Sequence, residues 1–181
     1  MKKLFVVLVT AMLCFSAVGC GAKGETAEEA VTAALTAMKN LDQETFAKYV
    51  DFEVPDSQEG AEEVKAMLEN LSFQITSSEE TEDSATVQAD ITNIDMSAVM
   101  QTYIGKAFAL AFSGGGTELT EEDASKMLME SIAENKENLV TTPVTIQLKK
   151  VEGNWKIDMD DSLQAAIYGG LSGLEEEEPE E

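Results

Sequence analysis

The spacing of apolar side chains predicts helices in the first part of the chain. Between Thr26 and Asn40, apolar residues recur at three- and four-residue steps, and Thr26 begins a Thr-x-x-Glu capping box. A second short helix is predicted over residues 42–50, with its cap at the aspartate. A third is predicted to begin at Pro55 and to carry an apolar stripe as far as Leu71.

The period then changes to the two-residue alternation that is typical of strands. Apolar and polar residues alternate over 73–76 and again over 85–92, with a polar turn predicted at 77–84. This pattern predicts a β-hairpin. A second hairpin is predicted over 144–159, where Gly153-Asn154 makes the turn.

Two helices are predicted between these hairpins. The first runs from Met96 to about Phe112, and it is apolar nearly all round, with Lys106 as its only charge. We expect this helix to be buried on both sides, and the alternative is that it offers one face to a partner or ligand. The second begins at Thr120 and ends near Asn138.

These elements predict an α+β fold. An antiparallel sheet of about four strands, made of two hairpins, packs against the N-terminal helices, and the helical pair is inserted between the hairpins. A last short helix is expected to begin at Asp161 or Ser162. We expect one domain over residues 26–172, followed by a disordered tail over 173–181, because that tail is nearly all acidic.

The N-terminus has the pattern of a secretion signal. Lysines precede an apolar run over 4–15, which is shorter than the ~20 residues that a spanning helix needs. Residues 17–20, Ala-Val-Gly-Cys, resemble the lipobox of bacterial lipoproteins, which implies that the Cys20 thiol receives a diacylglyceryl group. The alternative is an ordinary signal peptide that happens to end in Cys. We expect residues 1–19 to be removed and residues 20–25 to form a lipidated tether.

Composition narrows the classes of function. Among 181 residues there are 12 Lys and 35 Asp or Glu, with no Arg and no His, so the formal net charge is −23. No imidazole base and no guanidinium clamp for phosphate is therefore present. A nucleic acid would be repelled by this charge, so we expect no nucleic-acid partner. We also expect no cofactor.

Two segments carry a resemblance to a known family. The segment 28–46, which begins Glu-Glu-Ala-Val, and the late hairpin with Gly153-Asn154-Trp155 are similar to uncharacterised lipoproteins of Gram-positive bacteria that have a nuclear-transport-factor-2-like (cystatin-like) domain. The resemblance covers roughly residues 26–168. It implies a curved sheet whose concave face receives the helices and forms a cone with a cavity. The helical pair over 95–138 departs from the family pattern.

Acidic residues give two candidate sites. Three aspartates near the end of the second hairpin could bind calcium, but the ligand alternation, the Gly and the distant Glu of a calcium loop are missing, so we expect no metal site. These are Asp158, Asp160 and Asp161. In a cone-shaped fold, Asp90 could act as a general base, with Tyr103 as a second acid–base candidate. The alternative for Asp90 is a solvated strand residue.

Aromatic residues give a candidate ligand pocket. Four of them could line an apolar pocket with a polar handle, and the alternative is that they belong to an ordinary core. They are Phe46, Phe73, Tyr103 and Trp155.

These observations together predict a lipid-anchored extracytoplasmic binding or interaction module. It is expected on the outer face of the cytoplasmic membrane, attached through lipid on Cys20. Its partner would be a small apolar ligand or an envelope protein. Two alternatives stay open, namely a small-cavity enzyme of the isomerase or dehydratase type and a structural protein of the cell envelope.

Overall fold

The computed structural model describes residues 24–50, 61–113 and 120–171. Predictions that fall on other residues lie outside this part of the chain. They concern the signal peptide, the lipidated Cys20, the start of the third helix at Pro55 and the acidic tail.

Four antiparallel strands form one open sheet in the order β1-β2-β3-β4. The strands are β1 (Ser72–Glu80), β2 (Ser84–Ile94), β3 (Leu139–Val151) and β4 (Asn154–Ile157). The two predicted hairpins are β1–β2 and β3–β4. They are joined by the pairing of β2 with β3, whose register runs from Ser84 opposite Lys149 to Ile94 opposite Leu139. The predicted α+β class is confirmed.

Both hairpin turns differ from the prediction in their position. Residues 77–80 were expected in a turn, but they continue β1 beyond a register shift between Ile75 and Ser77, because they still pair with β2. The second turn is Glu152–Gly153 rather than Gly153-Asn154. Both of its residues have positive φ, 52° and 84°, as a type I′ turn requires.

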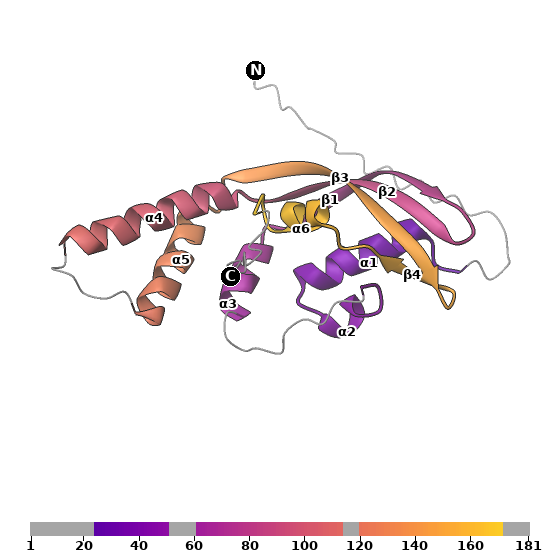
Figure 1. The fold of residues 1–181 in the computed structure, drawn as a ribbon, viewed down its shortest axis with the longest axis horizontal. Helices are drawn as coiled ribbons and strands as arrows, with labels where there is room; N and C mark the ends of the chain where they lie inside the picture. Colours follow the sequence, from indigo (N-terminus) through magenta and orange to yellow (C-terminus); the bar gives the residue numbers. More distant parts are fainter. Residues whose placement is uncertain (1–23, 51–60, 114–119, 172–181) are drawn as a thin grey trace, which may run out of the picture.

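Four helices lie on one side of this sheet, as Figure 1 shows. They are α1 (Ala27–Lys39), α2 (Gln43–Phe46), α3 (Ala61–Leu68) and α6 (Asp161–Ile167). The predicted capping box of α1 is present. The cap of α6 is Asp160, whose side chain accepts from Leu163 N, rather than Asp161 or Ser162.

The main core lies between α1, α6 and the covered face of the sheet. Every second residue of β2 points into it, which explains the alternation seen in the sequence. Buried members from these three elements are Ala30, Val31, Ala34, Leu35, Val87, Ala89, Ile91, Leu163 and Ile167. Each large side chain that is fully buried contributes about 1.5 to 3 kcal/mol. The other face of the sheet is polar, and Thr92 and Thr141 share a hydrogen bond of 2.7 Å there.

The helical pair consists of α4 (Met96–Ser113) and α5 (Glu121–Asn135). In Figure 1, α4 continues outward from the end of the sheet, and α5 lies below it. Only the first part of α4 is buried, in a small second core of Ile94, Met96, Val99 and Ile132. The expectation that α4 is buried on both sides is therefore wrong for its distal half. None of the helices within residues 24–50, 61–113 and 120–171 is long and apolar enough to cross a membrane.

Candidate functional site

The four aromatic candidates are not brought together into one pocket. Phe46 and Trp155 are buried in the main core, and Phe73 is partly buried against it. Tyr103 lies on α4, outside that core. Three of the four side chains thus fill space between the sheet and the helices.

Two shallow depressions are lined by described residues, and none of the four aromatics lines either one. The first, of about 420 Å³, lies over α1 and the start of α2, with Thr32, Thr36, Asn40, Asp42 and Thr45 among its walls. The second, of about 430 Å³, lies between α4 and α5, with Lys106, Leu110, Asp123, Met127 and Glu130 among its walls. Both are open to solvent.

Asp90 lies on the face of the sheet that the helices do not cover. Its neighbours Ala89 and Ile91 are buried in the core, so the Asp90 side chain points the opposite way. Across the ladder it is paired with Gln74 and Pro143. The second acid–base candidate, Tyr103, lies on α4. The structure therefore does not bring these two residues into one catalytic arrangement.

Asp160, one of the three candidate metal ligands, caps a helix. Its Oδ1 accepts from Leu163 N at 2.8 Å and from the Ser162 hydroxyl at 2.7 Å. These two hydrogen bonds, that from Leu163 first, lower the pKa of the Asp160 carboxyl. In the part of the chain that the structure describes, no group of three His, Cys, Asp or Glu side chains could hold a metal ion.

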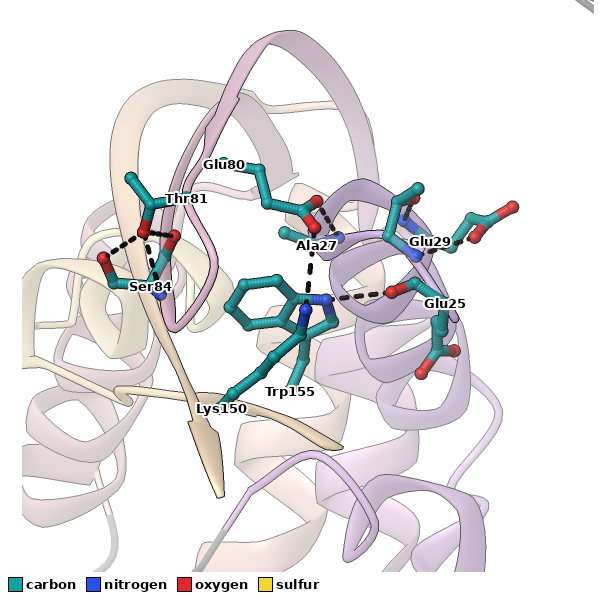
Figure 2. A network of polar contacts seen from close by, with 9 residues as sticks. Glu25, Ala27, Glu29, Glu80, Thr81, Ser84, Lys150 and Trp155 are labelled. Atoms are coloured by element: carbon teal, nitrogen blue, oxygen red, sulfur yellow. Dashed lines mark hydrogen bonds and ion pairs between the residues drawn. The ribbon is translucent and has the colours of Figure 1, made fainter. Parts of the chain in front are cut away.

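A polar network surrounds Trp155 at the end of the sheet where the domain begins (Figure 2). The Trp155 side chain is 1% exposed. Its Nε1 donates to the Glu25 carbonyl oxygen at 3.0 Å. The Lys150 ammonium lies 4.3 Å from the centroid of the indole ring, within the range of a cation–π interaction. The aromatic ring is thus held by its face and by its one polar atom.

Glu80 connects this network to the first helix. Its carboxylate lies 3.9 Å from the Lys150 ammonium and accepts from Ala27 N at 3.1 Å. Ala27 is the first residue of α1, whose N-terminal N–H groups lack partners within the helix. Figure 2 shows Glu80 above the indole, between Lys150 and Ala27. One carboxylate therefore links β1, β3 and α1.

Glu25 is held at a second point by Tyr49. The Tyr49 hydroxyl donates to the Glu25 carboxylate at 2.6 Å. That hydrogen bond, followed by burial and the negative charge of Glu25, raises the pKa of Tyr49 to about 12. Glu25 thus accepts hydrogen bonds through both its carbonyl and its carboxylate. It is the last residue of the predicted tether, so the network holds the residue at which this tether is predicted to meet the domain.

The sequence interpretation singled out Trp155 but not the residues around it. Lys150 lies directly opposite Trp155 in the β3–β4 register. The predicted turn at Gly153-Asn154 would have placed Glu152 there instead, so the one-residue error in the turn hid this contact. Tertiary packing brings the other members of the network together, namely Glu25, Tyr49 and Glu80. Their spacing in the sequence does not indicate that they meet.

An exposed apolar stripe on α4 is the second candidate site. Its three members are Ile104, Phe108 and Phe112, which are 48%, 60% and 86% exposed. They lie one above another because they are four residues apart on a helix. The rings of Phe108 and Phe112 are stacked, with centroids 6.3 Å apart. We refer to these three residues as the α4 stripe.

The α4 stripe lies away from α5. Lys106, on the other side of the helix, reaches Glu130 at 3.1 Å and Glu134 at 2.9 Å, both of which belong to α5. From Met96 to Thr117 the sequence contains no Asp or Glu, although the chain has 35. The stripe is therefore an apolar surface on a segment without acidic residues, in a strongly acidic protein.

Comparisons with known proteins give one similarity. No family model and no curated protein sequence matches the chain. Among solved structures, it is similar to the Bacillus subtilis protein YcdA, described provisionally as a lipoprotein, with 20% identity over 79% of this chain and a TM-score of 0.42. The match spans 44% of the length of that protein. No statement about function follows from a similarity of this size.

Proposed function

We propose that this chain is a lipid-anchored extracytoplasmic interaction module that contacts another protein through the α4 stripe. The observation that carries the proposal is the exposure of Ile104, Phe108 and Phe112, which reaches 86% at Phe112. Burial of such side chains is worth about 1.5 to 3 kcal/mol each. Contiguous exposed apolar patches on soluble proteins mark interaction sites.

A protein surface suits this site better than a small ligand. Small-molecule sites are concave and enclose most of the ligand, whereas the stripe is the outer side of a helix. The aromatics that were candidates for an enclosed pocket instead lie in or against the main core. The enzyme alternative gains no support from Asp90 and Tyr103, because they lie on separate elements and are not brought together.

The anchoring part of the proposal rests on the sequence Ala17-Val18-Gly19-Cys20. A tether that ends at Glu25 spans at most ~3.5 Å per residue, so it would hold the start of the domain within about 20 Å of the bilayer. The network around Glu25 gives that tether a fixed attachment point. The nuclear-transport-factor-2-like family remains part of the proposal, supported by N-terminal helices on one face of an antiparallel sheet.

Anchoring is tested by Cys20→Ala. The variant should move from the membrane fraction to the soluble fraction, because the thiol that carries the lipid is gone. Cys14→Ala is the matched control and should stay with the membrane, since Cys14 lies within the segment that is removed. A membrane-bound Cys20→Ala variant, or a wild-type protein with no acyl mass on Cys20, would contradict the lipoprotein assignment.

Contact through the stripe is tested by labelling introduced cysteines with a membrane-impermeant maleimide. Phe112→Cys should react more slowly on intact cells than in the purified, diluted protein, because a partner covers it on the cell. Thr32→Cys, on the exposed side of α1, should react equally in both. Equal labelling of Phe112→Cys in the two preparations would overturn the interaction proposal and favour a purely structural envelope protein.

A further inference from the structure

We infer that the partner of the α4 stripe is the α4 stripe of a second copy of this chain. The inference rests on the function proposed above and names the partner. In this arrangement two α4 helices pack side by side about a two-fold axis, so that each copy uses the same surface.

The shape of α4 is complementary to itself. The stripe forms a ridge of large side chains at four-residue steps, and rows of small residues at the same steps flank it. One row is Gly105 and Ala109, and the other is Ala107 and Ala111. Apart from its chain neighbours and the backbone of α4 itself, nothing lies within 4 Å of the place where a Cβ on Gly105 would be. Helices pack by placing such ridges into such grooves, and here one surface carries both.

The charge distribution permits this contact and opposes most others between two copies. The chain carries a formal net charge of −23, so surfaces rich in carboxylates repel each other. Charges farther apart than ~8 Å are largely screened at physiological ionic strength. α4 has no carboxylate, and its one ammonium, on Lys106, is already paired within its own chain. Two stripes can therefore meet without a carboxylate of α4 on either side of the contact.

A lipid surface fits the same residues less well. Helices that lie in a membrane interface carry Lys or Arg beside their apolar face. The neighbouring helix here begins instead with Glu121, Glu122 and Asp123. An anionic leaflet would repel these groups and the acidic body behind them.

The size of the contact predicts that pairing depends on the membrane. At 150 to 250 Å² for an aromatic side chain, the exposed parts of Ile104, Phe108 and Phe112 amount to about 400 Å² per copy. Stable complexes in solution bury about 800 Å² per partner. Two lipid-anchored copies share one surface, which raises their effective concentration. We therefore expect a pair on the membrane that dissociates when the protein is diluted in solution.

Disulfide cross-linking on intact membranes tests this inference on the full lipidated chain. With Cys14 removed and Cys20 acylated, an introduced cysteine is the sole free thiol. Single-cysteine variants are made at four neighbouring positions of α4: Gly105→Cys, Phe108→Cys, Ala109→Cys and Phe112→Cys. Because a disulfide requires a Cβ–Cβ distance of ~3.5 to 4.5 Å, at least one position near the two-fold axis should give a covalent dimer on mild oxidation. Thr32→Cys should give none.

A second substitution then tests whether the stripe itself makes the contact. Adding Phe112→Glu to the position that cross-links best, or Phe108→Glu if that position is Phe112, should abolish the covalent dimer, because it places two carboxylates in the interface. Higher ionic strength should increase cross-linking of the parent variant, since it screens the repulsion between the two acidic bodies. Cross-linking that survives the glutamate would overturn the inference.

The remaining outcomes separate this inference from the function on which it rests. If no α4 position cross-links but Phe112→Cys is still protected from maleimide, a different protein covers the stripe. The self-pairing inference then fails and the interaction proposal stands. If α4 cysteines neither cross-link nor show protection, both fail. If Thr32→Cys cross-links as well as the α4 variants do, the dimers arise from random collision and self-pairing is overturned.

Discussion

Aromatic side chains are placed in opposite ways at the two ends of this molecule. At the end where the domain begins, Trp155 is 1% exposed, and its polar atom and ring face both have partners. At the far end of α4, Phe112 is 86% exposed and contacts the ring of Phe108. At the first end the large aromatic side chain stabilises the fold. At the second end the aromatic side chains are exposed and free to contact another molecule.

This difference shows that the stability of the domain and its proposed contact surface are separate. The core between α1, α6 and the sheet is closed by β4 and the Trp155 network. The distal half of α4 adds little to that core, since the second cluster reaches only as far along it as Val99. Changes to the stripe should therefore alter association without unfolding the domain, and changes to the network should do the reverse.

Truncation of the two aromatics should give the largest contrast. Trp155→Ala removes a buried indole, its hydrogen bond and its contact with Lys150, so it should lower the free energy of unfolding by ~3 to 5 kcal/mol. Phe112→Ala should change it by less than ~0.5 kcal/mol, because the side chain is exposed. Denaturant titration followed by circular dichroism measures both.

Trp155→Phe is the milder companion variant. It keeps most of the apolar volume and loses the Nε1 donor, so its effect should lie between those of the other two. If Phe112→Ala were as destabilising as Trp155→Ala, the distal half of α4 would be part of the folding core and the comparison would be wrong.

The next largest effect on the free energy of unfolding is expected at the joint between the two regions, where α6 and the sheet meet the start of α4. Gly169, just after α6, has φ of 63°, and a Cβ there would lie 1.8 Å from the Ile94 carbonyl oxygen. Its own carbonyl accepts from Met96 N at the start of α4. Gly169→Ala should therefore cost about 3 kcal/mol, because backbone must move at the place where sheet, α4 and α6 meet.

Gly170→Ala is the matched control for this joint. Gly170 also has positive φ, 90°, but nothing lies within 4 Å of its Cβ position. It should show only the strain of a left-handed alanine, about 1 kcal/mol. The difference between the two variants, measured by denaturant titration, isolates the clash with Ile94. Equal effects would mean that close packing at the joint is unimportant.

The fold could be predicted from the sequence where the spacing of apolar residues shows which side of a helix or strand is buried. The alternation of β2 gave its buried face correctly, and the Thr-x-x-Glu spacing gave the start of α1. The turn over residues 77–84 was wrong, because a run of exposed polar residues gives no sign that it continues to pair with β2. Local pattern does not contain that information.

The candidate sites were predictable to a smaller degree. α4 is apolar nearly all round, so its pattern could not show which half would be covered, and burial was expected throughout. What leaves the stripe exposed is the direction in which α5 packs, through Lys106 and through the hydrogen bond of Ser125 to Glu63 on α3. The pairing of Glu25 with Tyr49 likewise joins residues with no periodic relation. These features depend on tertiary packing.

The smallest expected effect concerns the Tyr49–Glu25 hydrogen bond, and it depends on pH. The pKa of Tyr49 is raised from 10.0 to about 12 in the folded protein. The unfolded chain therefore loses this proton at lower pH than the folded one. The stabilisation is complete below pH 10 and is lost as the pH rises from about 10 towards 12. Tyr49→Phe should lower the free energy of unfolding by about 1 kcal/mol at pH 8.

The difference in the free energy of unfolding between wild type and Tyr49→Phe should shrink as the pH rises above 10, because all other titratable groups are common to both proteins. Tyr168→Phe is a useful control, because burial rather than a hydrogen bond raises the pKa of Tyr168. The difference in the free energy of unfolding between wild type and Tyr168→Phe should also depend on pH above 10, although no bond to Glu25 is lost.

Glu25→Gln should remove the carboxylate and bring the Tyr49 pKa back towards its ordinary value. Spectrophotometric titration of the tyrosines measures this directly. A tyrosine titration that is unchanged by Glu25→Gln would contradict the Tyr49–Glu25 hydrogen bond, and Glu25 would then be held by Trp155 Nε1 alone.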